Sequence, residues 1–238
     1  MLMPSVFKQD RKSMFILAAL LLIVAFAQAE NMFGFPYYHD EEGTHIANGW
    51  SVATQGRLSP YTYSYEDPFG GPIIMAAWDL IIGGPAAYGF PLNSGRILML
   101  IMHVAATALI YLNAKKITRS EIASLVASLI FALSPLTTAM QRVVHMENIM
   151  VVWLLAALYL VVGENRTLMH YYASAFMLGL AFLTEESAIF FIPMFLYIVY
   201  SAADKQHRRF AVTLWLAIVV LVVSFYPMYA QMKEELFP

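Results

Sequence analysis

Seven long apolar runs, separated by short polar segments, constrain this chain more than any other feature of its sequence. The runs are Ser13–Ala29, Ile97–Ala114, Ile122–Ala139, Ile149–Gly163, Thr167–Thr184, Ser187–Ala203 and Phe210–Met232. A helix needs roughly 20 mostly apolar residues to cross a bilayer. Lipid cannot satisfy the open edge of a sheet, so the runs predict helices. We therefore expect an all-α, polytopic transmembrane bundle of about seven spans, forming a single membrane domain over residues 1–238.

The first apolar run has two interpretations. Lys8, Arg11 and Lys12 precede it and Ala27-Gln28-Ala29 ends it, a pattern similar to a secretory signal with a small-residue cleavage site. The run can also be the first membrane span. We interpret it as the first transmembrane helix.

The positions of the basic residues predict the orientation of the bundle. With the N-terminus in the cytoplasm, ten Lys and Arg residues fall in inner segments and four in outer segments. Basic segments stay on the cytoplasmic side. We expect an integral membrane protein with a cytoplasmic N-terminus, and with its first loop and its C-terminus outside.

The charge balance and the absence of cysteine exclude several classes of function. A net charge of −2 leaves no basic surface for nucleic acid. Without cysteine there is no disulfide framework, no thiolate metal site and no cysteine nucleophile. The bilayer is the first partner that the sequence predicts.

The long connection from Glu30 to about Gly95 is the predicted functional loop. It begins with aromatic and acidic residues around Asp40-Glu41-Glu42, continues into a helix-like segment Ile46–Gln55, and includes an apolar stretch, Ile73–Ile82. That stretch is too short to span and fits an interfacial helix. Twelve of the sixteen acidic residues fall on the predicted outer side, so we expect binding or chemistry there.

Several short motifs occur in an order similar to that of a known family. The motifs are Asp40-Glu41, Gly56, Asp67-Pro68, Arg96, Ala132-Leu133-Ser134-Pro135, Arg142, Glu147-Asn148 and Leu178 to Thr184. In this order the chain resembles the GT-C glycosyltransferases, in particular the protein mannosyltransferase and aminoarabinose transferase branch. The resemblance extends from about Met14 to Val199 and corresponds to the N-terminal seven-helix module of that family.

The resemblance implies transfer of a sugar from a polyprenyl-phosphate carrier to an acceptor hydroxyl at the outer face, with no required cofactor. Asp40 would be the catalytic base, and Glu41 would orient the acceptor or share a cation. Arg96 and Arg142 would bind the lipid phosphate. Glu147, which belongs to a matching motif, and Glu186, which directly follows another, are further candidates for substrate binding.

Structural alternatives exist for these residues. Asp40, Glu41 and Glu42 can be the acidic first turn of a helix, which the helix dipole favours. Arg142 can anchor a helix end at the interface.

One departure from the family pattern suggests a second function. Glu185-Glu186 stands where the family usually has a lysine that contacts the lipid phosphate. Two carboxylates would repel a phosphate. The alternative is a non-catalytic membrane subunit that acts as a structural partner, or a chain whose site is completed by another membrane chain.

Histidines near the outer carboxylates suggest a divalent metal. His39, His45 and His145 all fall on the predicted outer side, close in sequence to acidic residues. Imidazole with carboxylate suits zinc or a similar ion. Their spacing matches no strong metal-binding signature, so an ordinary polar cluster is the alternative.

Overall fold

The computed structural model describes residues 4–59, 68–163 and 166–232, and the side chains of residues 4–10 and Asp40 lie outside its description. The described residues form helices and turns without any strand, which confirms the all-α prediction. The α-helices are α1 (Pro4–Ala29), α2 (Asp40–Gln55), α3 (Gly70–Ile82), α4 (Pro91–Thr118), α5 (Glu121–Leu133), α6 (Pro135–Met140), α7 (Met146–Val161), α8 (Leu168–Thr184), α9 (Ile192–Ala202), α10 (Arg208–Val223) and α11 (Phe225–Met232). Two 3-10 helices are η1 (Pro85–Tyr88) and η2 (Glu186–Phe191).

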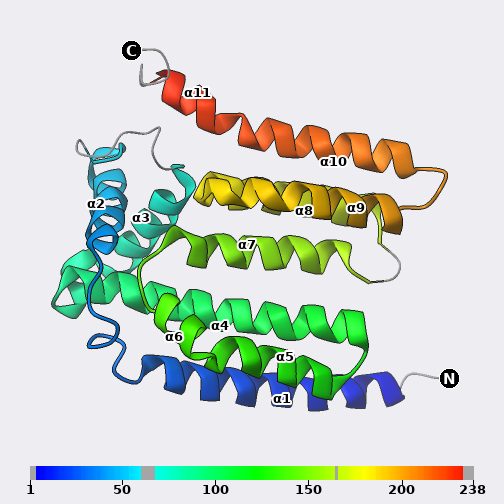
Figure 1. The fold of residues 1–238 in the computed structure, drawn as a ribbon, viewed down its shortest axis with the longest axis horizontal. Coiled ribbons are helices and arrows are strands. Elements are labelled where there is room, and N and C mark those ends of the chain that lie inside the picture. Colours follow the sequence, from blue (N-terminus) through cyan, green and yellow to red (C-terminus); the bar gives the residue numbers. More distant parts are fainter. Residues whose placement is uncertain (1–3, 60–67, 164–165, 233–238) are drawn as a thin grey trace.

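The long helices lie side by side, and α2 and α3 lie together at one end of them (Figure 1). We call this the α2–α3 end; it also carries η1, α6 and the first residues of α4 and α7. The opposite end carries the start of α1, the α4–α5 turn, and the starts of α8 and α10. Helix α4 packs against α1, α5 and α7, while α8 packs against α7 and α10.

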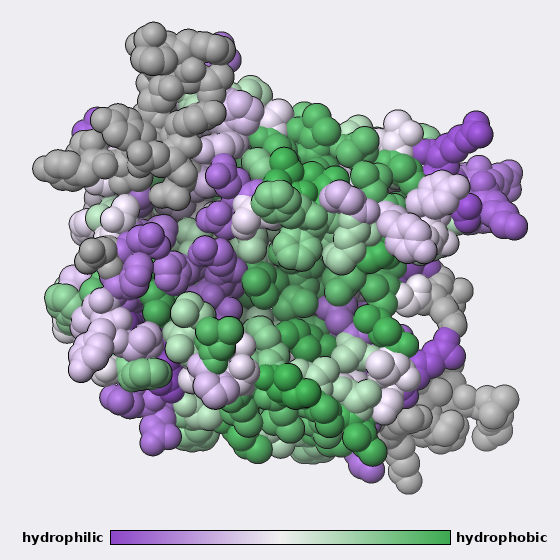
Figure 2. Space-filling view, viewed as in Figure 1, coloured by the Kyte–Doolittle hydropathy of each residue, from purple (hydrophilic) through white to green (hydrophobic). Residues whose placement is uncertain are grey.

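The surface has the character of a membrane protein. Three helical stretches of the described residues are long and apolar enough to cross a membrane: Arg11–Ala29 of α1, Pro91–Thr118 (α4), and Arg208–Met232, which comprises α10 and α11; further apolar helices are shorter. Figure 2 shows hydrophobic side chains over the middle of the bundle and hydrophilic ones gathered toward its two ends. Such a belt between polar ends fits a bilayer. That the chain crosses the membrane seven times stays a prediction.

Three of the predicted continuous runs are interrupted. The run Ile122–Ala139 is divided at Ser134, which is extended (φ −60°, ψ 130°) because it precedes Pro135. The run Ser187–Ala203 begins as η2, and α9 starts with Pro193 in its first turn. The run Phe210–Met232 is divided at Ser224, since the ring of Pro227 disfavours a continuous helix four residues earlier.

Helices α2 and α3 form a packed pair over the end of the bundle. A Cβ on Gly49 of α2 would lie 2.5 Å from the Cβ of Met75 on α3, so glycine permits this close approach. Met75 and Ile46 share a buried cluster with Leu98 and Ile149 of α4 and α7. The predicted helical segment Ile46–Gln55 begins earlier, at Asp40, and α2 and α3 are attached to the bundle core through this cluster.

Candidate functional site

The carboxylate of Glu42 is the centre of the polar structure at the α2–α3 end. Glu42 is fully buried, and its two oxygens accept hydrogen bonds from the Arg96 guanidinium at 2.8 and 3.0 Å. They also accept from the backbone N–H of His39 at 2.9 Å and that of Val144 at 3.1 Å. One side chain therefore connects the start of α2, the start of α4 and the segment before α7.

This environment keeps Glu42 ionised. Burial raises the pKa of Glu42, but the hydrogen bonds from Arg96, from the His39 and Val144 backbones, and the charge of Arg96 outweigh it. The pKa of Glu42 is therefore held below its usual value. A charged, buried pair is the result.

Arg96 uses all five of its N–H groups on protein acceptors. In addition to the two bonds to Glu42, it donates to the backbone carbonyls of Met32 (2.8 Å), Pro36 (3.0 Å) and Tyr37 (3.5 Å). An arginine has five such donors and no acceptor. A phosphate could bind Arg96 only by displacing one of these partners, so the predicted phosphate contact stays a prediction without support from this arrangement.

Arg142 holds the same segment from another direction. It lies between α6 and α7 and is buried, and it donates to the carbonyls of Gln28 (3.1 Å), Ala27 (3.0 Å), Glu30 (2.8 Å) and Phe35 (3.4 Å). Arg96 and Arg142 together bind seven backbone carbonyl groups between the last turn of α1 and Tyr37. Arg142 thus contacts the end of α1 and the segment that follows it, while its roles as an interfacial anchor or a phosphate ligand stay predictions.

The two helix starts held by Glu42 bring several predicted site residues together. Glu41 Oε2 lies 3.5 Å from Nδ1 of His145, and Glu147 Oε2 lies 3.8 Å from the same nitrogen. The ring centroids of His39 and His145 are 5.7 Å apart. These four residues, distant in sequence, form one cluster at the starts of α2 and α7.

The remaining predicted residues lie around this cluster or apart from it. Asp40 begins α2, but its side chain lies outside the described residues. His45 is buried one helical turn further along, with its ring centroid 6.4 Å from that of His145. His45 is not among the residues whose ligand atoms lie within 4.8 Å of one another.

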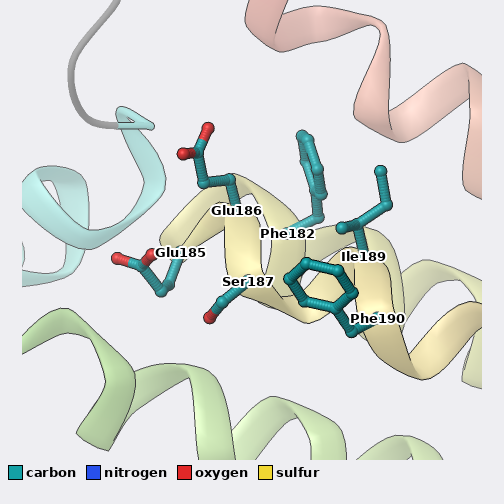
Figure 3. A pocket seen from close by; sticks show the side chains of 6 residues that line it. All are labelled: Phe182, Glu185, Glu186, Ser187, Ile189 and Phe190. Atoms are coloured by element: carbon teal, nitrogen blue, oxygen red, sulfur yellow. The ribbon is translucent and has the colours of Figure 1, made fainter.

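Glu186 lines a separate pocket of about 310 Å³ at the start of η2. Figure 3 shows Glu185 and Glu186 on one side of this pocket and Phe182, Ile189 and Phe190 on the other. A pocket with two carboxylates and an apolar wall suits hydroxyl or cationic groups better than a phosphate. No residue of α2 is among those that line it.

Glu42 is the residue that sequence reasoning missed as an organiser. The sequence does carry one signal, because Glu42 stands three residues after His39, the N-cap of α2, and a glutamate there often bonds back to the N-cap backbone. That local signal predicts the bond to the His39 N–H. It does not predict Arg96, which lies 54 residues away.

One comparison with known proteins identifies a family. The profile of the family described as dolichyl-phosphate-mannose-protein mannosyltransferase matches residues 71–229. No curated protein and no solved structure matches the chain. The matched region includes Arg96, Arg142, Glu147 and Glu186, while Asp40 and Glu41 precede it.

Proposed function

The chain belongs to the dolichyl-phosphate-mannose-protein mannosyltransferase family, and from that premise we propose that it transfers a sugar from a polyprenyl-phosphate carrier at the α2–α3 end. The family is of GT-C type, and GT-C proteins are membrane glycosyltransferases. The observation that supports this location is the buried ion pair between Glu42 and Arg96. Glu42 lies in the first turn of α2 beside Asp40 and Glu41, and its bonds to Arg96 and to the Val144 N–H hold this turn against the starts of α4 and α7. Rigid support of this kind is what a catalytic group needs.

The proposed reaction is a displacement at the anomeric carbon of the donor sugar. The oxygen of an acceptor hydroxyl forms a bond to that carbon, while the bond from the carbon to the phosphate oxygen breaks and the phosphate leaves with the electron pair. The Asp40 carboxylate takes the hydroxyl proton as general base. The leaving phosphate has to be stabilised as its negative charge develops.

The residues around Asp40 have supporting roles in this proposal. Arg96 and Arg142 act as positioning residues, because their donors hold the carbonyls of the segment before α2. Glu186, in its pocket with Glu185, binds hydroxyl groups of a substrate sugar. Glu147 lies beside His145 at the start of α7 and borders the same end.

Replacing Asp40 tests the proposal. Asp40→Asn should lower sugar transfer about a hundred- to ten-thousand-fold, since it removes the proton acceptor with little change of shape. The measurement is transfer of radiolabelled sugar from polyprenyl-phosphate carriers, mannose first, in membranes that contain the full chain. Helix content and membrane insertion of the variant should equal those of the wild type.

Asp204→Asn is the matched control, because Asp204 is an exposed aspartate in the connection before α10, at the opposite end. It should transfer at the wild-type rate. Wild-type transfer by Asp40→Asn would contradict the assignment of the base.

A non-catalytic role in a membrane complex is the second candidate, and the acidic pocket at Glu185 and Glu186 is the observation that favours it. In that case Asp40→Asn would leave glycans unchanged. Removal of the Glu185 and Glu186 charges would instead release a co-purifying membrane chain, as measured by affinity purification in mild detergent.

A further inference from the structure

Three side chains at the starts of α2 and α7 have the arrangement of metal ligands. His39, Glu41 and His145 each offer one ligand atom, and these atoms lie within 4.8 Å of one another. The group differs from the three histidines expected from sequence, since it includes Glu41 and does not include His45. We propose that His39, Glu41 and His145 bind one divalent metal ion, with zinc as the best match.

The chemistry and the spacing of the group both favour zinc. Two imidazoles with one carboxylate form a frequent zinc ligand set that leaves a fourth position for water. Zinc–ligand distances of about 2.0–2.2 Å in a tetrahedron separate two ligand atoms by about 3.4 Å. Nδ1 of His145 and Oε2 of Glu41 are 3.5 Å apart, so this pair already has the required separation.

The frame behind these ligands is rigid. The backbone N–H groups of His39 and Val144 both donate to the carboxylate of Glu42, and Val144 is the residue just before His145. Glu42 is in turn held by the saturated guanidinium of Arg96. The two histidines therefore meet because a buried network sets the positions of their backbones, and an ion would not have to order them from separate loops.

Charge and access also suit a cation. The ion pairs of Glu41 and Glu147 in the described part of the chain are both with His145. A divalent ion would balance these two carboxylates, and Glu147 is close enough to serve as a fourth ligand or to bind the ion's water. The Glu41 side chain is 62% exposed and that of His145 is 21% exposed, so an ion can enter from water.

The proposal does not depend on glycosyl transfer, and binding is measured directly. The full chain, purified with a tag that contains no histidine and stripped with chelator, is titrated with Zn²⁺ in competition with a chromophoric chelator. We expect one tight site per chain. The double variant His39→Asn/His145→Asn should weaken zinc binding at least about 100-fold, because loss of groups that only orient ligands already costs about 10- to 100-fold.

Asparagine is chosen because both histidines are helix N-caps, a position that asparagine favours. The control variant, His170→Asn/His207→Asn, removes two histidines of the opposite end and should bind zinc like the wild type. Equal binding by the wild type and the His39/His145 variant, or no tight binding by the wild type, would overturn the proposal.

If the double variant fails to fold, the wild type decides the question. Zinc should protect His39 and His145, but not His207, from modification by diethyl pyrocarbonate, with the modified residues identified by mass spectrometry. Modification of His39 and His145 that is unaffected by zinc would also overturn the proposal.

Discussion

The two ends of the bundle use ion pairs in different ways. At the α2–α3 end, Glu42 and Arg96 are both 0% exposed and are 2.8 Å apart. At the opposite end, Lys115 and Glu121 are 3.2 Å apart, with side chains 34% and 31% exposed. Ser13 and Tyr111 also hydrogen-bond Glu121, so this pair joins α1, α4 and α5.

The buried pair at the α2–α3 end holds the segment between α1 and α2 in place, whereas the exposed pair at the opposite end joins three helices beside a short turn. Exposed ion pairs contribute little to stability, whereas breaking a fully buried pair leaves an uncompensated charge. The α2–α3 end has the long loop, and its buried charges bind backbone groups in the last turn of α1, in the segment between α1 and α2, and at Val144 just before α7. The opposite end has short connections that need no such frame.

The strongest test of the difference between the two ends is whether they lie on opposite sides of the membrane. We expect an impermeant thiol reagent to label Gln55→Cys at the α2–α3 end and to miss Gln206→Cys at the other end, an all-or-none difference. The chain has no native cysteine, and both positions are exposed. Labelling in intact cells, with permeabilised cells as the control, measures it, and the reverse pattern would reject the predicted orientation.

The next largest effect should come from neutralising each ion pair. Glu42→Gln leaves Arg96 buried without its counter-ion and should lower the free energy of unfolding by about 3–5 kcal/mol. Glu121→Gln, its matched control at the opposite end, should cost about 1 kcal/mol or less. Thermal unfolding in detergent, followed by circular dichroism, measures both, and equal losses would remove the distinction between the two ends.

The smallest effect concerns Asp79 of α3, a buried carboxyl at the α2–α3 end whose Oδ2 has no hydrogen-bond partner among the described residues. Burial raises the pKa of Asp79 to about 6. The folded chain then keeps a proton that the unfolded chain has lost, so stability should fall as the pH rises from about 4 to 6 and stay low above that.

Asp79→Asn should remove this pH dependence and raise stability at pH 7.5 by about 1–3 kcal/mol. Unfolding measured at pH 5 and pH 7.5 in both proteins tests it. Glu42 has the opposite sign: its lowered pKa contributes stability that is lost as the pH falls toward and below its usual value. If the stability of the Asp79→Asn variant still declines between pH 5 and pH 7.5, a group other than Asp79 causes the pH dependence.

The candidate site could be predicted in part because some of its signals are local. The sequence predicts a helical segment from Ile46 and offers Asp40, Glu41 and Glu42 as the alternative acidic first turn, and α2 does begin at Asp40. It places Glu147 at the head of the run Ile149–Gly163, and Glu147 lies in the first turn of α7. It also places Arg96 at the start of a long apolar helix. What Arg96 contacts could not be predicted, since its acceptors are at Met32, Pro36, Tyr37 and Glu42, and the same local pattern fits a free cation.

The sequence by itself determined the helical class of this protein and the short connections between its apolar runs, because the cost of exposing backbone groups to lipid acts on each segment separately. The breaks inside the predicted runs have local causes too, since a proline such as Pro135 acts on its own neighbours, but the apolar pattern alone predicted those runs as continuous. Only the tertiary structure decided that Glu42 meets Arg96 and Val144, and that His39 and Glu41 meet His145. Those contacts join residues 54 to 106 positions apart, and they depend on how helices pack in three dimensions, which no local pattern specifies.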